Sequence, residues 1–259
     1  MGALSHKVAV ITGASSPQGI GRAIARRFAA AGASLYLVAG RGTALQLRDA
    51  VAECNNLSKG EGGYSRSGVH DLAAAGVPEK MVDSAVKLFG RIDVLVNNAA
   101  TSVKLDFGEI PRALVNDVLA VNLLAPFFAS QAVLPIMRRQ RGGRIIHIGS
   151  QLGTVANEKR AVYGMSKAAL AYLAKAMAYE LAPDGIIVNA ISPGPTLTGV
   201  VGEAMKKDPR LEKQRKSYMR INRLGRPEEI ADVAFFLATG APELLLGQNI
   251  VVDGGYTSH

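Results

Sequence analysis

The sequence is poor in cysteine, and Cys54 is the only one among 259 residues. A single cysteine cannot close an internal disulfide, so the chain does not fit the disulfide-stabilised secreted domains. We expect a reducing, cytoplasmic location. Nothing basic flanks Cys54 in the sequence, which argues against a reactive thiolate at this position.

The sequence also lacks long apolar runs and clusters of metal-binding residues. No apolar stretch looks long enough for a signal peptide or a membrane-spanning helix, so we expect no membrane association. The histidines, aspartates and glutamates do not show the spacing of metal ligands, and we therefore expect no metal site.

Aromatic residues are few, at 5% of the chain, although the formal net charge is +9. Nucleic-acid binding is one interpretation of this charge, and it rests on the charge alone. The sequence shows no zinc-finger spacing, no arginine-rich arm and no ladder of aromatic residues on which bases would stack. Attraction of an anionic cofactor or substrate is a simpler interpretation.

Short apolar runs alternate with amphipathic helical stretches along the whole chain. This pattern is typical of an α/β domain in which helices cover both faces of a parallel sheet. We expect one doubly wound domain over residues 1–259, with Gly60–Gly68 as a surface loop. The predicted strands are Val8–Thr12, Ser34–Ala39, Ile92–Asn97, Ile145–Gly149, Ile186–Ile191 and Asn249–Val252. The predicted helices are Gly21–Ala31, Thr43–Asn55, Pro78–Phe89, Ala113–Arg139, Ala161–Leu181 and Pro227–Ala238.

A glycine-rich turn joins the first strand to the first helix. It runs from Gly13 to Gly21 and includes Gly19. Glycines let the backbone approach a pyrophosphate closely, and the helix N-terminus then offers amide donors. Between a first strand and a first helix, such a turn predicts a Rossmann-type dinucleotide site.

The end of the second predicted strand bears on the choice of cofactor. An NAD site of this type has an acidic residue there for the ribose 2′-hydroxyl, but this chain has Gly40 followed by Arg41. An arginine can pair with a 2′-phosphate. We therefore favour NADP(H) over NAD(H), with a solvated Arg41 and use of either cofactor as the alternative.

A tyrosine and a lysine, Tyr163 and Lys167, stand four residues apart, and Ser150 precedes the tyrosine by 13 positions. Positions i and i+4 lie on the same face of a helix, so the lysine charge can approach the phenol. A nearby cation lowers the pKa of a phenol, and a tyrosine with a lowered pKa can act as a general acid or base. The Ser150 hydroxyl follows an apolar strand and can share a substrate oxygen with Tyr163.

Taken together, these motifs resemble the short-chain dehydrogenase/reductase family over nearly the whole chain. The general likeness is greatest to the 3-oxoacyl-[acyl-carrier-protein] reductases, but sugar, polyol, steroid and ketone reductases share every motif. The motifs, in the order and spacing of the family, are the glycine turn, Asp71-Leu72, Asn97-Asn98-Ala99-Ala100, Asn122, Ser150, Tyr163/Lys167, Pro193-Gly194 and Asp253-Gly254-Gly255.

The resemblance implies a catalytic set of Asn122, Ser150, Tyr163 and Lys167. Ser150 would position the substrate oxygen and Tyr163 would exchange the proton. Lys167 would lower the pKa of Tyr163 and bind the nicotinamide ribose. Asn122 would help to hold a water that links Lys167 to solvent.

The resemblance also implies a set of cofactor contacts. Asp71, after a third strand, and the Leu72 backbone would lie by the adenine, while Thr196 and Thr198 would hold the nicotinamide carboxamide. The full expected set is Gly13, Ser15, Gln18, Gly19, Ile20, Gly21, Arg41, Asp71, Leu72, Asn98, Ala99, Ala100, Tyr163, Lys167, Pro193, Gly194, Thr196 and Thr198.

The chain departs from the family pattern at three places. Five residues instead of three separate Gly13 from Gly19, and we expect the turn to bulge near Pro17 and Gln18 while the glycines keep their roles. Gln18 stands where NADP-preferring members often have a basic residue, so Arg41 alone supports NADP(H). Ala100 stands where the family more often has glycine.

Two basic segments have alternative interpretations. Residues 195–226 resemble the mobile substrate lid of the family, and Glu203–Arg226 holds nine basic and three acidic residues. This excess indicates either an anionic substrate or a solvated helix face. The run Arg138-Arg139-Gln140-Arg141, with Arg144, either docks an acidic carrier protein or only aids solubility. His147 is interpreted as a packed strand residue.

The prediction is a cytoplasmic NADP(H)-dependent oxidoreductase that reduces a carbonyl to a secondary alcohol, or the reverse, with a 3-oxoacyl compound as one candidate substrate. By resemblance, the long helices would pair across a two-fold axis and form a homotetramer. The alternatives are an NAD-dependent alcohol, polyol or sugar dehydrogenase and a regulator that binds cofactor without catalysis. The intact set of four catalytic residues argues against the regulator.

Overall fold

A seven-stranded parallel sheet forms the centre of the protein. The computed structural model describes residues 2–208 and 210–258, and within them the strand order is β3-β2-β1-β4-β5-β6-β7. The strands are β1 (Val8–Thr12), β2 (Ser34–Ala39), β3 (Ser65–Val69), β4 (Val94–Asn97), β5 (Gly143–Ile148), β6 (Ile186–Pro193) and β7 (Asn249–Val252). The strand order reverses between β1 and β4, which is where parallel sheets of this kind bind their ligands.

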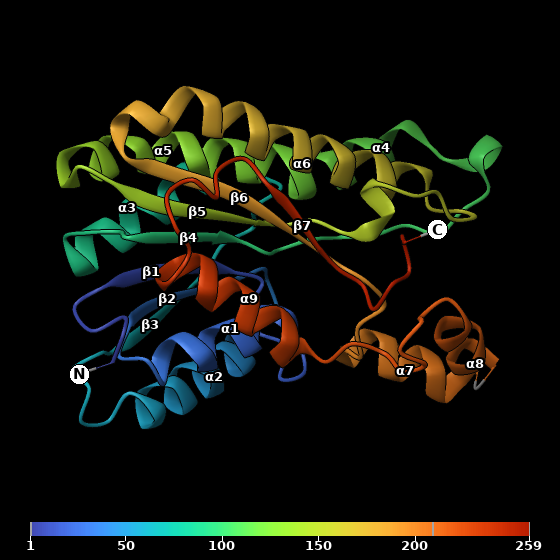
Figure 1. The fold of residues 1–259 in the computed structure, drawn as a ribbon, viewed down its shortest axis with the longest axis horizontal. Coiled ribbons are helices and arrows are strands. Elements are labelled where there is room, and N and C mark those ends of the chain that lie inside the picture. The colour runs from blue at the N-terminus through green and yellow to red at the C-terminus, as the bar shows by residue number, and fades with distance from the viewer. Residues whose placement is uncertain (1, 209, 259) are drawn as a thin grey trace.

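Helices cover both faces of the sheet, as expected (Figure 1). One layer consists of α1 (Ile20–Ala29), α2 (Ala44–Leu57) and α9 (Pro227–Thr239), and the other of α3 (Val77–Phe89), α4 (Arg112–Leu119), α5 (Ala125–Gln140) and α6 (Ala161–Leu181). Alternate residues of β1 serve the two layers: Ile11 belongs to the core with α1 and α9, whereas Val10 belongs to the core with α3, α5 and α6. The sheet is thus buried on both sides, which explains its apolar strands.

Strand β3 corrects one prediction. Residues 65–68 were expected in a surface loop, but they form the start of a strand that pairs with β2. The segment reads Ser-Arg-Ser-Gly-Val and is only partly buried. A strand at the edge of a sheet needs no continuous apolar run, so its sequence resembled a loop.

The helix predicted at Ala113–Arg139 is continuous but not uniform. Five residues, Ala120–Leu124, form a π-helical segment between α4 and α5. By length and composition, Arg112–Gln140 could cross a membrane, although no such stretch was expected. In the fold, Ala129, Val133 and Met137 of this helix are buried in the core between the sheet, α3 and α6. One face of the helix therefore packs in the core of this fold.

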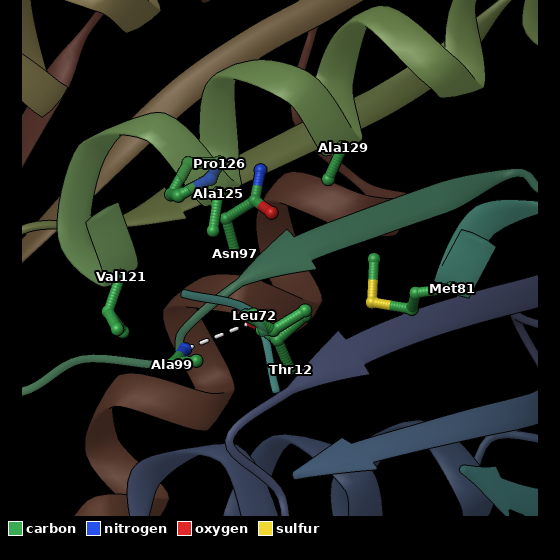
Figure 2. A pocket seen from close by; sticks show the side chains of 9 residues that line it. All are labelled: Thr12, Leu72, Met81, Asn97, Ala99, Val121, Ala125, Pro126 and Ala129. Carbon is green, nitrogen blue, oxygen red and sulfur yellow. Dashed lines mark hydrogen bonds between the residues drawn. The ribbon is translucent and has the colours of Figure 1, made fainter. Parts of the chain in front are cut away.

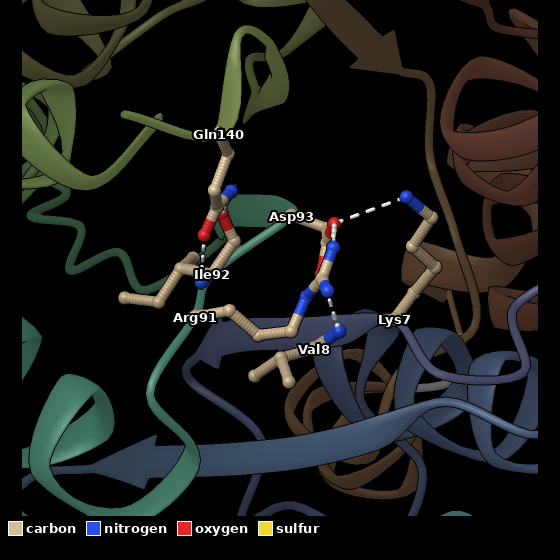
Figure 3. A network of polar contacts seen from close by, with 6 residues as sticks. All are labelled: Lys7, Val8, Arg91, Ile92, Asp93 and Gln140. Atoms are coloured by element: carbon tan, nitrogen blue, oxygen red, sulfur yellow. Dashed lines mark hydrogen bonds and ion pairs between the residues drawn. The ribbon is translucent and has the colours of Figure 1, made fainter. Parts of the chain in front are cut away.

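A buried carboxylate joins β1 to β4 at the end of the sheet where these strands begin (Figure 3). Asp93 accepts hydrogen bonds from the Val8 amide at 2.9 Å, from Arg91 at 2.7 Å and from Lys7 at 3.1 Å. Burial raises the pKa of Asp93, but these three donors together lower it by more than burial raises it, so the pKa lies below its ordinary value. This cluster lies far from the candidate site along both strands and serves the fold.

Two short helices, α7 (Gly199–Lys207) and α8 (Arg210–Ser217), project beyond the sheet at the end where the strands finish (Figure 1). They fall within the predicted lid. Shorter turns complete the described chain: η1 (Phe107–Glu109), η3 (Gln151–Gly153) and η4 (Ala182–Asp184).

Candidate active site

The glycine turn after β1 packs tightly against the end of β4. Gly13 has a φ of +70°, which favours glycine, and a Cβ on it would lie 2.7 Å from Asn98 Nδ2. A Cβ on Gly21 would lie 2.5 Å from both Asn98 Nδ2 and the Gly13 carbonyl oxygen. Both positions therefore require glycine because the backbone of the turn, the first turn of α1 and Asn98 touch one another.

The two extra residues form a β-turn. The Gly19 amide donates to the Ser16 carbonyl at 2.9 Å, which leaves Pro17 and Gln18 at the two central positions, and proline suits the first of these. Arg26 donates to the Pro17 carbonyl at 3.0 Å. The expected bulge is confirmed. The turn also reaches the lid, because a Cβ on Gly199 would lie 3.7 Å from Gln18 Oε1.

The N-terminus of α1 fits a phosphate group. Gly19 is the residue before the helix, no side chain caps α1, and its first turn holds no acidic residue. The amides of Ile20 and Gly21 thus have no side-chain acceptor. The turn before them contains Gly13 and Gly19, which have no Cβ to obstruct a ligand. Ser15 is partly buried and Gln18 is exposed on the same turn. These donors, with the positive end of the helix dipole, suit a pyrophosphate.

A threonine that was not predicted connects β1 to β4. Thr12 Oγ1 accepts hydrogen bonds from the amides of Asn98, at 2.9 Å, and Ala99, at 3.0 Å. The Asn98 side chain donates back to the carbonyls of Thr12, at 2.8 Å, and Gly13, at 3.1 Å. The Thr12–Asn98 pair holds the two strand ends in one conformation. The only sequence signal for Thr12 was its place directly before Gly13, while Ala100 is exposed beyond this contact.

Arg41 and Asp71 lie at the next strand ends, and the structure brings them together. Their side chains form a loose ion pair, with Arg41 Nε 3.7 Å from Asp71 Oδ2. The Arg41 side chain is 85% exposed. Two expected cofactor contacts thus lie side by side, and the guanidinium keeps room to turn.

A small pocket lies beneath the end of β4 (Figure 2). Leu72 and Ala99, both expected cofactor contacts, lie on its wall together with Val121, which was not predicted. Val121 directly precedes Asn122, so its neighbour carried the only signal. The remaining wall residues are Thr12, Met81, Asn97, Ala125, Pro126 and Ala129. The wall is mainly apolar and stands beside the strand ends, where the cofactor is expected.

Asn122 is fully buried in the π-helical segment. Its side chain forms a pair of hydrogen bonds with the Thr101 backbone, accepting from the amide at 2.8 Å and donating to the carbonyl at 2.9 Å. It also donates to Ser166 Oγ at 3.0 Å. Asn122 thus joins the loop after β4 to α6, the helix that carries Tyr163 and Lys167.

Ser150 and Tyr163 face each other across the site. Ser150 follows β5, donates to Gln151 Oε1 at 3.0 Å and accepts from the Leu152 amide at 3.2 Å. Burial raises the pKa of the Tyr163 phenol; the hydrogen bond with Ser150 and the charge of Arg160 lower it, but not enough to reverse the direction. The expected lowering by Lys167 is therefore not what this structure shows.

Lys167 is buried, with 2% of its surface exposed. Its Nζ donates to the Ile148 carbonyl at 2.8 Å and lies 5.8 Å from the centre of the Tyr163 ring. Burial lowers the pKa of Lys167 to about 8. His147 is fully buried nearby and bonded to Asn97, and burial together with the Lys167 charge lowers its pKa to about 3. His147 is thus a packed strand residue, as interpreted.

The loop after β6 passes against β7. The Gly194 amide donates to the Val252 carbonyl at 2.9 Å, and a Cβ on Gly194 would lie 2.6 Å from Asp253 Cα. Thr196 is buried and its hydroxyl donates to the Gly194 carbonyl at 2.9 Å. Pro193 ends β6, and Thr198 precedes α7. The expected carboxamide loop therefore has a fixed conformation.

Acidic residues of the lid and of the neighbouring helix α9 pair with part of the lid charge. Ion pairs join Lys206 to Glu203, Arg210 to Asp208, and both Arg223 and Arg226 to Glu229. The side chains of Glu212 and Arg215 lie outside the described residues. Among the residues that the structure describes, at least four of the nine basic residues thus serve local structure, which favours the solvated-face interpretation for them.

Cys54 and the possible metal ligands add no second site. Cys54 is fully buried and burial raises its pKa to about 12, so its thiol is not a nucleophile. Within residues 2–208 and 210–258, His, Cys, Asp and Glu side chains form no group of three or more that could hold a metal ion.

Comparison with known proteins places this geometry. Residues 13–257 match a family model described as enoyl-(acyl carrier protein) reductase. The chain is 33% identical to an NAD-dependent glycerol dehydrogenase of Listeria innocua, over 98% of this chain and 95% of that protein. It is 34% identical to a 3-oxoacyl-[acyl-carrier-protein] reductase of Aquifex aeolicus, over 97% and 98%. A solved structure assigned as an NAD(P)-dependent gluconate 5-dehydrogenase of Beutenbergia cavernae, with NADP bound at low occupancy, superposes with a TM-score of 0.89 at 32% identity, over 99% and 98%.

Proposed function

This chain belongs to the short-chain dehydrogenase/reductase family of NAD(P)-dependent oxidoreductases, and from that premise we propose that it reduces a carbonyl to a secondary alcohol with NADPH, or catalyses the reverse reaction. The nicotinamide cofactor supplies or accepts the hydride. The observation that carries the proposal is the convergence of Ser150, Tyr163 and Lys167 at the end of β5, the strand that pairs with β4. The protein's own residues bind and orient the reactants and move the proton.

Tyr163 is the proposed general acid in the reducing direction. Burial raises the pKa of its phenol, so the phenol carries its proton at neutral pH. A carbonyl oxygen that accepts from the Tyr163 hydroxyl can also accept from the Ser150 hydroxyl once this turns from Gln151, because Ser150 lies close enough to Tyr163 to lower its pKa. Two donors on one oxygen stabilise the negative charge that develops there during reduction.

Lys167 and Asn122 are the proposed support for this proton transfer. With a pKa of about 8, Lys167 is mostly protonated at pH 7. The ammonium lies on the Tyr163 side of α6 and stabilises the phenolate that remains after the proton has moved. The hydrogen bonds of Asn122 to Thr101 and Ser166 fix the π-helical segment against α6, and a water held there would return the proton.

The preference for NADP(H) is part of the proposal and rests on Arg41. Gly40 and Arg41 follow β2 in place of the acidic residue that would accept from a ribose 2′-hydroxyl, and the Arg41 side chain is exposed. Its ion pair with Asp71 is long and solvent-exposed, so it costs little to break. A 2′-phosphate would then gain a charge-assisted hydrogen bond. The pocket wall of Leu72, Ala99 and Val121 is the proposed adenine surface.

An NAD-dependent polyol dehydrogenase is the second candidate. The identity of 33% to a glycerol dehydrogenase named for NAD favours it, as does an Arg41 that already has Asp71 as a partner. A 3-oxoacyl substrate is supported to a similar extent by the Aquifex aeolicus relative. We keep the carbonyl class as the proposal and leave the chain length of the substrate to the assay.

Self-association and a cytoplasmic location also belong to the proposal. Tyr172 and Tyr179 on α6 are 71% and 88% exposed, and exposed aromatic side chains on one helix are typical of an interface. They support the homotetramer expected from the family. The single cysteine supports a reducing compartment.

The test is turnover with NADPH and NADH over a panel of 3-oxo esters, diketones, sugars and cyclic ketones. We expect NADPH-dependent turnover that Tyr163→Phe abolishes while cofactor affinity is kept. Arg41→Ala should weaken NADPH binding and leave NADH binding unchanged. A clear preference for NADH in the wild type would refute the role of Arg41. Cofactor binding without turnover on any substrate would favour the regulator.

A further inference from the structure

A second cation near Tyr163 is Arg160, which precedes the tyrosine in the sequence, whereas Lys167 follows it. Arg160 directly precedes α6, three positions before Tyr163, and its carbonyl accepts from the Gly164 amide at 2.8 Å. Residues at this spacing lie on the same side of a helix, with roughly 5–6 Å between their Cβ atoms. The Arg160 charge is close enough to the Tyr163 phenol to lower its pKa, although burial has the larger effect and raises it overall.

The Arg160 guanidinium also contacts the loop after β4. Arg160 Nη1 donates to Ser102 Oγ. The preceding residue, Thr101, is fixed by its two hydrogen bonds with Asn122. Ser102 and Arg160 are 58 positions apart in sequence, yet both are anchored to the elements that carry the candidate catalytic set.

Arg160 differs from neighbouring basic residues in having only a neutral partner. The adjacent Lys159 pairs with Asp106 at 2.7 Å, and the basic lid residues considered above pair with acids. Among the described residues, no carboxylate lies within ion-pair distance of Arg160. Its positive charge is therefore uncompensated at the edge of the reacting centre, and its planar set of donors matches a carboxylate.

We propose that Arg160 and Ser102 together bind a carboxylate on the substrate, next to the carbonyl held by Tyr163 and Ser150, so that the enzyme prefers short oxo acids to neutral ketones. This inference rests on the proposed function, because it places the anion beside that carbonyl. Arg160 supplies the charge and Ser102 a hydroxyl. Sugars, polyols and neutral esters would leave the guanidinium without a counter-charge.

A binding experiment tests this without turnover. The wild-type protein is saturated with oxidised cofactor, which cannot react with an oxo acid, and titrated by calorimetry with 3-oxobutanoate and with its methyl ester. We expect the acid to bind about tenfold more tightly than the ester, the difference that one charge-assisted hydrogen bond commonly makes. Equal binding of the two compounds by the wild type would overturn the proposal.

Three variants assign the effect to Arg160. Arg160→Met should remove the preference for the acid, Arg160→Lys should retain part of it, and Lys159→Met, the matched control at a paired lysine, should leave it unchanged. Circular dichroism checks that each variant is folded. A preference for the acid that survives Arg160→Met contradicts the assignment.

Turnover of the same two compounds with reduced cofactor separates this inference from the proposed function. If the acid binds through Arg160 but neither compound is reduced, the anion site stands and the proposed reaction fails for this substrate class. If both compounds are reduced at equal rates and with equal affinity, the proposed reaction stands and the anion site fails.

Discussion

Replacement of Gly21 by alanine should have two opposing effects on stability: a gain in helix propensity and a steric clash. In an open helix, Gly→Ala stabilises by about 1 kcal/mol. Gly21 is not in open space, since its Cβ would lie 2.5 Å from Asn98 Nδ2 and from the Gly13 carbonyl oxygen. Overpacking of this kind costs about 1–3 kcal/mol, and loss of an Asn98 hydrogen bond adds about 1 kcal/mol. The steric effect should therefore win, with a net loss of roughly 1–3 kcal/mol.

The assay for Gly21→Ala is urea unfolding followed by circular dichroism, together with titration of NADPH fluorescence, at fixed protein concentration. We expect a lower urea midpoint and a weaker cofactor affinity, because the same shift displaces the phosphate-binding turn. Gly202→Ala is the matched control: Gly202 lies in α7 with nothing within 4 Å of a Cβ, so it should be neutral or stabilising. An unchanged midpoint and unchanged affinity in Gly21→Ala would refute the steric argument.

Three further outcomes are expected. The pKa of Asp93 is lowered in the folded protein. Its carboxylate therefore stabilises the fold above the unfolded-state pKa of about 4, and this stabilisation is lost as the pH falls through the folded-state pKa. Asp93→Asn should lower the urea midpoint at pH 7 and make the midpoint fall less steeply in acid. Burial lowers the pKa of Lys167 to about 8, so the side chain is still protonated at pH 7, and its buried charge destabilises the fold there. Lys167→Met should therefore raise the urea midpoint at pH 7 while turnover is lost. A lowered midpoint would contradict this. Thr12→Val should weaken cofactor binding about tenfold by leaving two amides without an acceptor, whereas Thr12→Ser should bind normally.

The core strands and the proposed reaction centre were predictable because their signals are local. An apolar run predicts a buried strand, and a spacing of four places Tyr163 and Lys167 on one helical face. The residue pattern missed the edge strand β3, which only the family resemblance implied before Asp71, because partial burial leaves it a polar sequence. The π-helical segment around Asn122 was missed because it differs from an α-helix only in how its backbone bonds.

Contacts between distant segments are the part that the sequence does not carry. Thr12 reads as an ordinary strand residue until β4 places two amides on its hydroxyl. Arg160 reads as a solvated charge before a helix until Ser102, in a loop 58 positions earlier, fixes its direction. The lid showed the reverse, since its basic excess is in part paired with acids of the lid itself and of α9. The number of charges in a segment therefore does not show which of them are available to a ligand.

The pKa shifts of Tyr163 and Lys167 concern the proposed proton transfer between Tyr163 and the substrate oxygen. Burial favours the neutral phenol and the neutral amine alike, so it raises one pKa and lowers the other. The neutral phenol is the form that can donate a proton, and the ammonium is needed only once a phenolate has formed. Pairing of these two buried charges then offsets the desolvation that each would suffer alone. A pKa compares the phenol with the phenolate, so ion pairing with Lys167 after proton transfer would lower the pKa of Tyr163. In this structure burial outweighs the lowering by Ser150 and Arg160, and the pKa is raised. The stabilisation of the phenolate by Lys167 therefore stays a prediction, which loss of turnover in Lys167→Met tests.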